Sequence, residues 1–518
     1  RLDVAAHART HERTKDAMRR RGFDAERFAA VVTSEARAVV ATMRSNARWS
    51  ARASNSALNG YGLYGTTDVY DGVEDGLLDA FANLRGAHVR TEATAETTKA
   101  GSSDGSRASG SGQVKPSSSS SLAHNGGLSP LEFLEPFLDV IRSVETSGLI
   151  TAQALSAILK ILKSGAVTPD VPGGAVTIMH AIADAVTLCR FEATSVEDDD
   201  AVLSQILFVL VECVKCSCGA ALSDDDLCDV FQACYRIGHQ SGKETPLLRE
   251  SSKQSLSDIV HHVGERLYEI VERASNDVQA KSPRLTSPRR SVVIPAPTND
   301  GESAASSPGA AAAGPGTDID AHEHTVSSKE PYGLPAFVEM FRFATSLIAP
   351  DTHGRGSEDA NSLFGLRLVS TMIDSNAEAF KSNRALLRLV VDDLSRALCG
   401  VVVSCSPHVL AATTTLITTL YFDFRSEMKL HLEVFVRMVI LPLCSTDVEE
   451  ESQRVALESL VDLCRHEHFA TDLYMYYDCD LTKPNVFEEV TSVLAQTSYP
   501  VDATISPVHL LSLEGLLC

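Results

Sequence analysis

A group of cysteines in the first half of the chain has the residue type and the close spacing that a zinc site requires. The group comprises Cys213, Cys216, Cys218, Cys228 and Cys234. Zinc takes four ligands, but no histidine or second CxxC pair completes a tetrahedral set here. Cys213 also continues an apolar helical pattern. We therefore interpret these cysteines as core residues and expect no metal site.

Two glycine-containing segments match short motifs of enzymes. Residues 60–65 satisfy G-x-G-x-x-G, but a dinucleotide site needs an apolar strand before the motif, and residues 51–59 do not provide one. Residues 101–105 satisfy the G-x-S-x-G pattern of a nucleophile elbow, yet Ser, Gly and Thr dominate their surroundings. Such a segment cannot hold the strained strand-to-helix turn that the elbow needs. A hydrolase built on 101–105 is the enzymatic alternative, and it requires this segment to be ordered.

The remaining candidates for chemistry are three acidic runs and a histidine pair. The runs at 197–200, 224–226 and 449–451 fall in loops or at predicted helix starts, where carboxylates are stabilised by the helix dipole. His261 and His262 lie on a predicted helix with one ring facing outward. No arrangement for acid–base, nucleophilic or phosphate chemistry remains, so we predict a chain without a catalytic site or a cofactor.

The elements that position these residues follow from composition and periodicity. Hydrophobic residues make up 44% of the 518 residues but aromatic residues only 6%, so Leu, Val, Ile and Ala must build the cores, which favours helices. The formal net charge of −22 argues against nucleic-acid binding through the bulk field.

Apolar residues recur at helical spacing through a first block. Two helix starts are marked by capping pairs, Ser129 with Glu132 and Ser223 with Asp226. Segment 202–214 is apolar almost all round and is therefore predicted to be the buried centre of the block.

Composition divides the chain. Residues 91–125 and 274–330 are too poor in apolar side chains to fold and are predicted to be disordered linkers, with 51–73 as a further flexible insertion. We therefore predict two helical domains, 24–273 and 331–518.

The second domain repeats the helical habit of the first. Helices are expected around 362–376, 384–403, 407–424, 427–443 and 449–465, and helix pairs recur at roughly the 40 to 47 residues of HEAT or armadillo units. We predict an all-α, armadillo/HEAT-like α-solenoid, with a compact irregular bundle as the structural alternative.

Cysteine usage and hydropathy indicate the compartment. The cysteines are scattered through helical patterns, which is typical of the reducing cytosol. No apolar run of about 18 residues occurs, so any membrane association is expected to be peripheral. Because the chain begins with Arg1 and stops at Cys518 inside an apolar pattern, we expect a fragment of a longer protein.

One motif near the end of the chain is specific. Tyr476-Tyr477-Asp478-Cys479-Asp480, followed by Pro-Asn-Val-Phe-Glu at 484–488, resembles the box of the "homology upstream of Sec-seven" domain of large Arf guanine-nucleotide exchange factors. Tyr476 stands where the family usually has Asn.

The first block resembles the same family's dimerisation and cyclophilin-binding domain. The resemblance rests on Asn-Ala-Arg-Trp-Ser at 46–50, Pro-Phe-Leu-Asp-Val-Ile-Arg-Ser at 136–143 and Ala-Asp-Ala-Val at 183–186, while Pro-Tyr-Gly-Leu-Pro at 331–335 resembles the start of the second domain. Together these segments indicate the Golgi brefeldin A resistance factor and GNOM branch.

The resemblance implies a regulatory and dimerisation scaffold, with the exchange domain beyond Cys518 and no exchange activity in this chain. It implies a homodimer, for which Lys160 and Asp200 are candidate contacts, and contacts with the downstream exchange domain. It also implies an Arf-family GTPase acting through the parent protein, a possible Rab-type GTPase or cyclophilin partner, and a cytoplasmic location, peripheral on Golgi membranes.

We interpret Tyr477, Asp478, Cys479 and Asp480 as a protein-interaction motif. The alternative is structural: Tyr477 and Cys479 pack inward while the aspartates cap the next helix. The alternative function for the whole chain is a generic HEAT-type adaptor or transport receptor that binds protein partners.

Overall fold

The structure, a computed structural model, contains helices and one isolated bridge between Ser147 and Glu192 in the residues that it describes. The predicted all-α fold is confirmed. The predicted insertions 51–73 and 91–125, and the motifs at 60–65 and 101–105, lie outside the described residues. These residues are 24–46, 76–84, 129–171, 174–192, 196–240, 245–281, 330–348, 355–401, 406–445, 448–499 and 505–518.

The helices of the first block begin where the capping pairs predict. Ser129 and Glu132 form a reciprocal capping box at the start of α5, and Ser223 and Asp226 do the same at α9. A short helical segment, 76–84, lies between α2 and α5 in the sequence. The named helices are α2 (Ala25–Ser45), α5 (Pro130–Arg142), α6 (Gly148–Lys163), α7 (Ala175–Thr187), α8 (Val196–Lys215), α9 (Asp224–Gln240), α10 (Pro246–Gly264) and α11 (Leu267–Lys281).

The helices of the second block agree with the five predicted ranges to within a few residues, apart from an earlier start of α13. They are α12 (Leu334–Ile348), α13 (Arg355–Asp374), α14 (Ala377–Ser382), α15 (Arg384–Arg388), α16 (Ser395–Val401), α17 (Pro407–Phe424), α18 (Lys429–Val434), α19 (Leu441–Leu443), α20 (Glu450–Cys464), α21 (Phe469–Leu473), α22 (Val486–Thr497) and α23 (Pro507–Leu517).

Three helices of the second block contain a π turn. The turns are η2 (Leu389–Leu394), η3 (Phe435–Ile440) and η4 (Tyr474–Asp478). In η4 the amide of Cys479 donates to the carbonyl of Tyr474, one residue further back than in an α-helix. They recur in the helices 384–401, 429–443 and 469–478, roughly one repeat apart.

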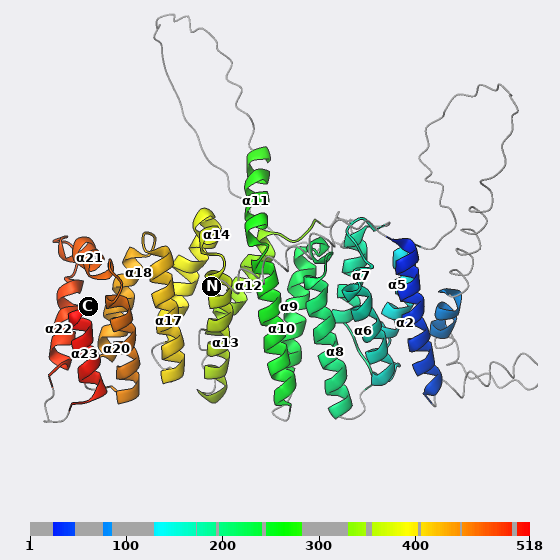
Figure 1. Ribbon diagram of the computed structural model, residues 1–518, viewed down its shortest axis with the longest axis horizontal. Coiled ribbons are helices and arrows are strands. Elements are labelled where there is room, and N and C mark those ends of the chain that lie inside the picture. The colour runs from blue at the N-terminus through cyan, green and yellow to red at the C-terminus, as the bar shows by residue number, and fades with distance from the viewer. Residues whose placement is uncertain are drawn as a thin grey trace, which may run out of the picture.

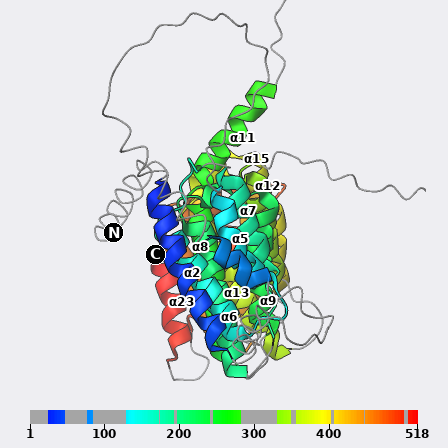
Figure 2. The same cartoon turned by 90° about the vertical axis from the view of Figure 1, so that its right-hand side faces the viewer.

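The helices stack side by side into an elongated array of two rows (Figures 1 and 2). In one row α6, α8, α10, α13, α17, α20 and α23 each pack on the next. In the other row α5, α7, α9, α12 and the 384–401 helix follow one another. Each helix contacts its neighbours in the row and across it, which is the geometry of an α-solenoid rather than a compact bundle.

The two predicted blocks pack directly on each other. Helix α9 contacts α12, and α10 contacts α13. The Asp224 carboxylate accepts from the amides of Gly333 (2.8 Å) and Ala336 (3.3 Å), so it caps α12 from the first block. The buried Tyr332 donates its amide to Leu222 and its hydroxyl accepts from Arg266. Segment 331–335 therefore docks on the first block.

Two details differ from the sequence predictions. Phe208, within the segment predicted to be buried all round, is 53% exposed, because the neighbours of α8 leave one stripe of it uncovered. The linker was predicted from residue 274, but α11 continues to Lys281. No proline interrupts the helix before Pro283, so the helix extends past the part that packs on α10.

Candidate protein-interaction site

The motif 476–480 follows α21 at the last part of the array and leads through a short turn into α22. The structure separates its four candidate residues into two groups. Tyr477 and Asp478 bond to other elements, whereas Cys479 and Asp480 lie on the outside of the turn.

Tyr477 ties the motif to helix α18. Its side chain is fully buried, and its hydroxyl donates to the backbone carbonyl of Lys429. Burial raises the pKa of Tyr477 above its usual value, so the hydroxyl stays protonated. The Lys429 ammonium in turn lies 3.8 Å from the ring centre of Tyr476. Tyr477 therefore holds two elements together and is not available on the surface.

Asp478 caps the following helix. Its two carboxylate oxygens accept from the amides of Phe487 (2.9 Å) and Glu488 (3.1 Å), which are among the free donors in the first turn of α22. Because the carboxylate lies at the positive end of the helix dipole, its charge adds to the stabilisation.

Asp480 forms a local turn. Its carboxylate accepts from the hydroxyl (2.7 Å) and the amide (3.0 Å) of Thr482. These hydrogen bonds, the side-chain one first, hold the pKa of Asp480 below its ordinary value. Cys479 beside it is exposed, which differs from the inward packing in the structural alternative. Cys479 and Asp480 are therefore the motif residues that face solvent.

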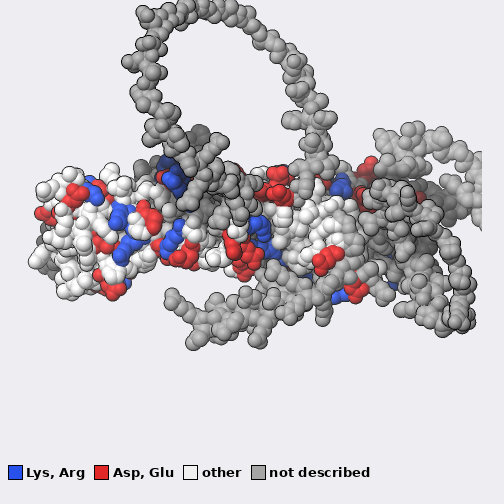
Figure 3. All heavy atoms as spheres, turned by 90° about the horizontal axis from the view of Figure 1, so that it is seen from above, with Lys and Arg blue, Asp and Glu red and all other residues white. Residues whose placement is uncertain are grey.

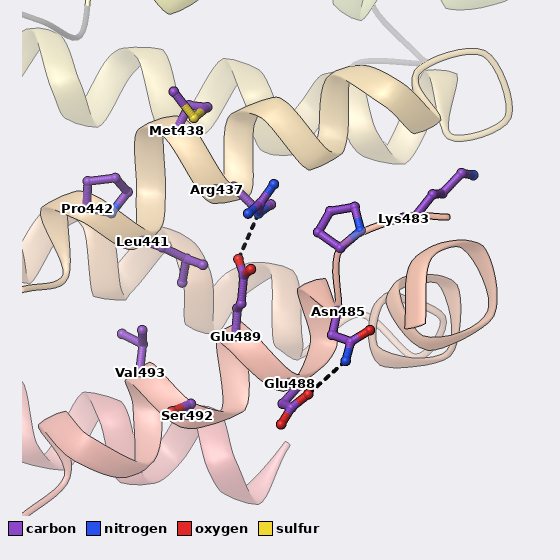
Figure 4. A pocket seen from close by; sticks show the side chains of 11 residues that line it. Arg437, Met438, Leu441, Pro442, Lys483, Asn485, Glu488, Glu489, Ser492 and Val493 are labelled. Atoms are coloured by element: carbon purple, nitrogen blue, oxygen red, sulfur yellow. Dashed lines mark hydrogen bonds and ion pairs between the residues drawn. The ribbon is translucent and has the colours of Figure 1, made fainter. Parts of the chain in front are cut away.

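A groove of about 830 Å³ lies between the 429–443 helix and the start of α22, next to the motif (Figure 4). One side carries Met438, Leu441 and Pro442, and the other carries Glu488, Glu489 and Val493. Arg437 spans the groove with its Nε 2.8 Å from Glu489. Sequence reasoning missed this groove, because its two sides are far apart in the sequence and meet only through Tyr477 and Arg437.

Comparison with known families gives an independent result for the same region. Residues 334–486 match the family described as "Mon2/Sec7/BIG1-like, HUS domain". The match includes Asp478, Cys479 and Asp480. The chain carries a Sec7-like HUS domain. The HUS domain is the one that the resemblance predicted, and its matched residues fall within the predicted second domain.

The relatives extend the similarity beyond the HUS domain. Over 422 residues the chain is 33% identical to ARF guanine-nucleotide exchange factor GNOM of Arabidopsis thaliana, covering 75% of this chain and 29% of GNOM. It is 26% identical over 495 residues to "Golgi-specific brefeldin A-resistance guanine nucleotide exchange factor 1 homolog" of Caenorhabditis elegans, covering 76% and 25%. The chain is thus homologous to both groups named in the prediction, but it spans less than a third of their length.

The candidate dimer residues lie in the first block, away from the HUS domain. The Lys160 ammonium is 2.9 Å from the Glu35 carboxylate of the same chain, which joins α6 to α2. Asp200 lies half-buried near the start of α8. The structure therefore shows an intrachain partner for Lys160.

The cysteines that suggested zinc lie in the core of the first block. Cys213, Cys216, Cys218 and Cys234 are buried, and burial raises the pKa of Cys216 to about 12. The predicted core position is confirmed for these four, while Cys228 is half-buried. Among the residues described, no group of three or more His, Cys, Asp or Glu side chains could hold a metal ion.

The remaining candidates behave as surface groups. His261 faces outward and His262 is mostly covered, as predicted. In the described part of the chain, no helix has the length and apolar character needed to cross a bilayer.

Proposed function

We propose that this chain is the regulatory and dimerisation scaffold of a large Arf-family guanine-nucleotide exchange factor. The observation that carries the proposal is the alignment of three quarters of the chain with exchange factors such as GNOM, together with the HUS domain at 334–486. The extended solenoid supports the proposal, because such arrays offer long surfaces for protein partners.

A second part of the proposal is that the exchange domain lies outside this chain, which does not itself catalyse exchange. Its support is the use of the polar motif residues: Asp478 and Asp480 accept hydrogen bonds within the chain. The parent protein would act on an Arf-family GTPase at Golgi membranes, as a peripheral cytoplasmic protein.

The test is release of a fluorescent GDP analogue from an Arf-family GTPase. We expect no acceleration by residues 1–518 and clear acceleration by the complete parent protein. Acceleration by the chain alone would overturn the division of labour. A complete protein without any exchange activity would overturn the family function.

We further propose that the first block forms a homodimer through a surface that includes Lys160 and Asp200. Lys160→Glu should weaken dimerisation in analytical ultracentrifugation. Glu35→Gln is the matched control, because it removes the intrachain partner of Lys160 but leaves the lysine charge in place. A monomeric wild-type chain, or equal weakening by both variants, would contradict the role of Lys160.

The outward-facing part of the motif, Cys479 and Asp480, is proposed as a contact for the exchange domain of the parent. The same scaffold surface class would serve Rab-type or cyclophilin partners. Asp480→Ala should change the exchange rate of the complete protein while its melting temperature stays the same. An unchanged rate would remove the motif from the functional surface.

A further inference from the structure

The outer face of the 429–443 helix is apolar and uncovered in the described structure. Leu430, Val434 and Met438 are 65%, 41% and 72% exposed, and Pro442 is exposed as well. Steps of four residues drift by about 40° each around a regular α-helix. The wider turn η3 reduces this drift, so the four side chains form one stripe. Exposed apolar stripes of this length mark binding surfaces.

The stripe borders the groove, whose charges give the chemistry of its partner. Arg437 is already held by Glu489 at 2.8 Å and by Glu433 at 3.5 Å. Lys483 donates to the carbonyl of Tyr476 and lies 3.9 Å from Asp480. Carboxylates outnumber cations by two in and around the groove, the full set being Glu433, Asp480, Glu488 and Glu489 against Arg437 and Lys483. The groove therefore favours a segment that combines basic and apolar side chains.

This acidic chain contains such a segment directly after α11. Between Val278 and Asn299 there is no Asp or Glu. Basic residues come first and an apolar run follows: Lys281, Arg284, Arg289 and Arg290, then Val292, Val293 and Ile294. The order matches a surface on which carboxylates lie beside an apolar stripe.

The segment can reach the groove within one molecule. Helix α11 contacts α12 and leaves the array toward the side where α12 and α15 lie (Figure 2). The groove is about three helix steps further along this row, or ~30 Å at 8–10 Å per step. Residues 282–291 span up to ~35 Å when extended. The return path to Glu330 has 35 residues, 295–329, which is ample.

We propose that residues 284–294 dock in cis on the groove and the stripe beside it, with the arginines facing Glu488 and the apolar run on Met438. The linker between the two blocks then carries a ligand for the HUS domain. This contact is independent of the proposed exchange-factor function, because it requires no GTPase and no exchange domain.

The test uses the full chain with its own segment disabled by Arg284→Glu, Arg289→Glu and Arg290→Glu. A fluorescent peptide of residues 281–295 is titrated into this protein and followed by anisotropy. We expect saturable binding that becomes about tenfold weaker when Met438→Asp is added. Met438 is 72% exposed, so this change leaves the fold intact. Leu247→Asp, at an 83% exposed position of α10, is the matched control and should change nothing.

Hydrogen exchange on the unlabelled chain provides the second readout. The amides of 438–443 and 486–493 should exchange faster in the triple arginine variant than in the wild type. Absence of peptide binding, or equal binding with Met438→Asp, overturns the proposal. So does protection of the groove that persists in the variant and grows with protein concentration, which assigns it to a second copy. Flotation of the variant with phosphatidylserine vesicles, lost on Met438→Asp, overturns it in favour of a lipid surface.

Discussion

Asp478→Ala should loosen α22 without unfolding the array. The change removes two hydrogen bonds, at 2.9 and 3.1 Å, from amides in the first turn of the helix. Loss of an N-terminal cap costs ~0.5–2 kcal/mol, and the half-exposed position of Asp478 places the expected loss near ~1 kcal/mol. Asp478→Asn, which keeps an uncharged acceptor, should lose about half as much.

The suitable assay is native-state hydrogen exchange, because solenoids open in local units rather than all at once. A loss of ~1 kcal/mol should raise exchange of the α22 amides about fivefold, while α20 stays unchanged. Asp480→Ala is the control, since Asp480 bonds only within its own turn and to Lys483. Unchanged α22 exchange in Asp478→Ala, or an equal rise in Asp480→Ala, would refute the capping role.

Three further predictions concern packing, pH and thiol reactivity. Gly365→Ala should destabilise by ~1–3 kcal/mol in urea titration, since its Cβ would lie 2.8 Å from the carbonyl oxygen of Ala344. Gly400→Ala, with open space around it, should gain up to ~1 kcal/mol, and the reverse order would contradict the packing. Burial alone would raise the pKa of Asp226, but hydrogen bonds from His180 and Ser223 outweigh it and the pKa is lowered below the ordinary 3.8. The unfolding free energy that Asp226→Asn removes should therefore be full near neutral pH and shrink as the pH falls below 3.8; a difference that grows there would contradict this sign. Exposed Cys479 should react with maleimide in the native chain while buried Cys213, whose pKa burial raises well above normal, reacts only in denaturant, as mass spectrometry can check.

The helices could be predicted from the sequence because their signals are local. The capping pairs Ser129 with Glu132 and Ser223 with Asp226 are three residues apart, and apolar periodicity supplied the rest. The exposure of Phe208 could not be predicted, since it depends on which neighbours α8 meets.

The site was predicted by residue type and location but not by its construction. Asp478 reaches amides nine and ten residues ahead, and no rule of helix-cap spacing covers that distance. Asp224 caps a helix more than one hundred residues away, so the close seam between the blocks has no local signal. The π turn η4 was equally invisible, because one additional residue per turn leaves no compositional trace.

The two-row array has a mechanical consequence. Each helix touches only its neighbours, and the two ends of the array, at α2 and α23, lie far apart with no stacking between them (Figure 1). A load applied at one end is therefore transmitted through every successive interface in series. Small rotations at each step add up, and the molecule bends as an elastic beam whose stiffness is set by its softest joint.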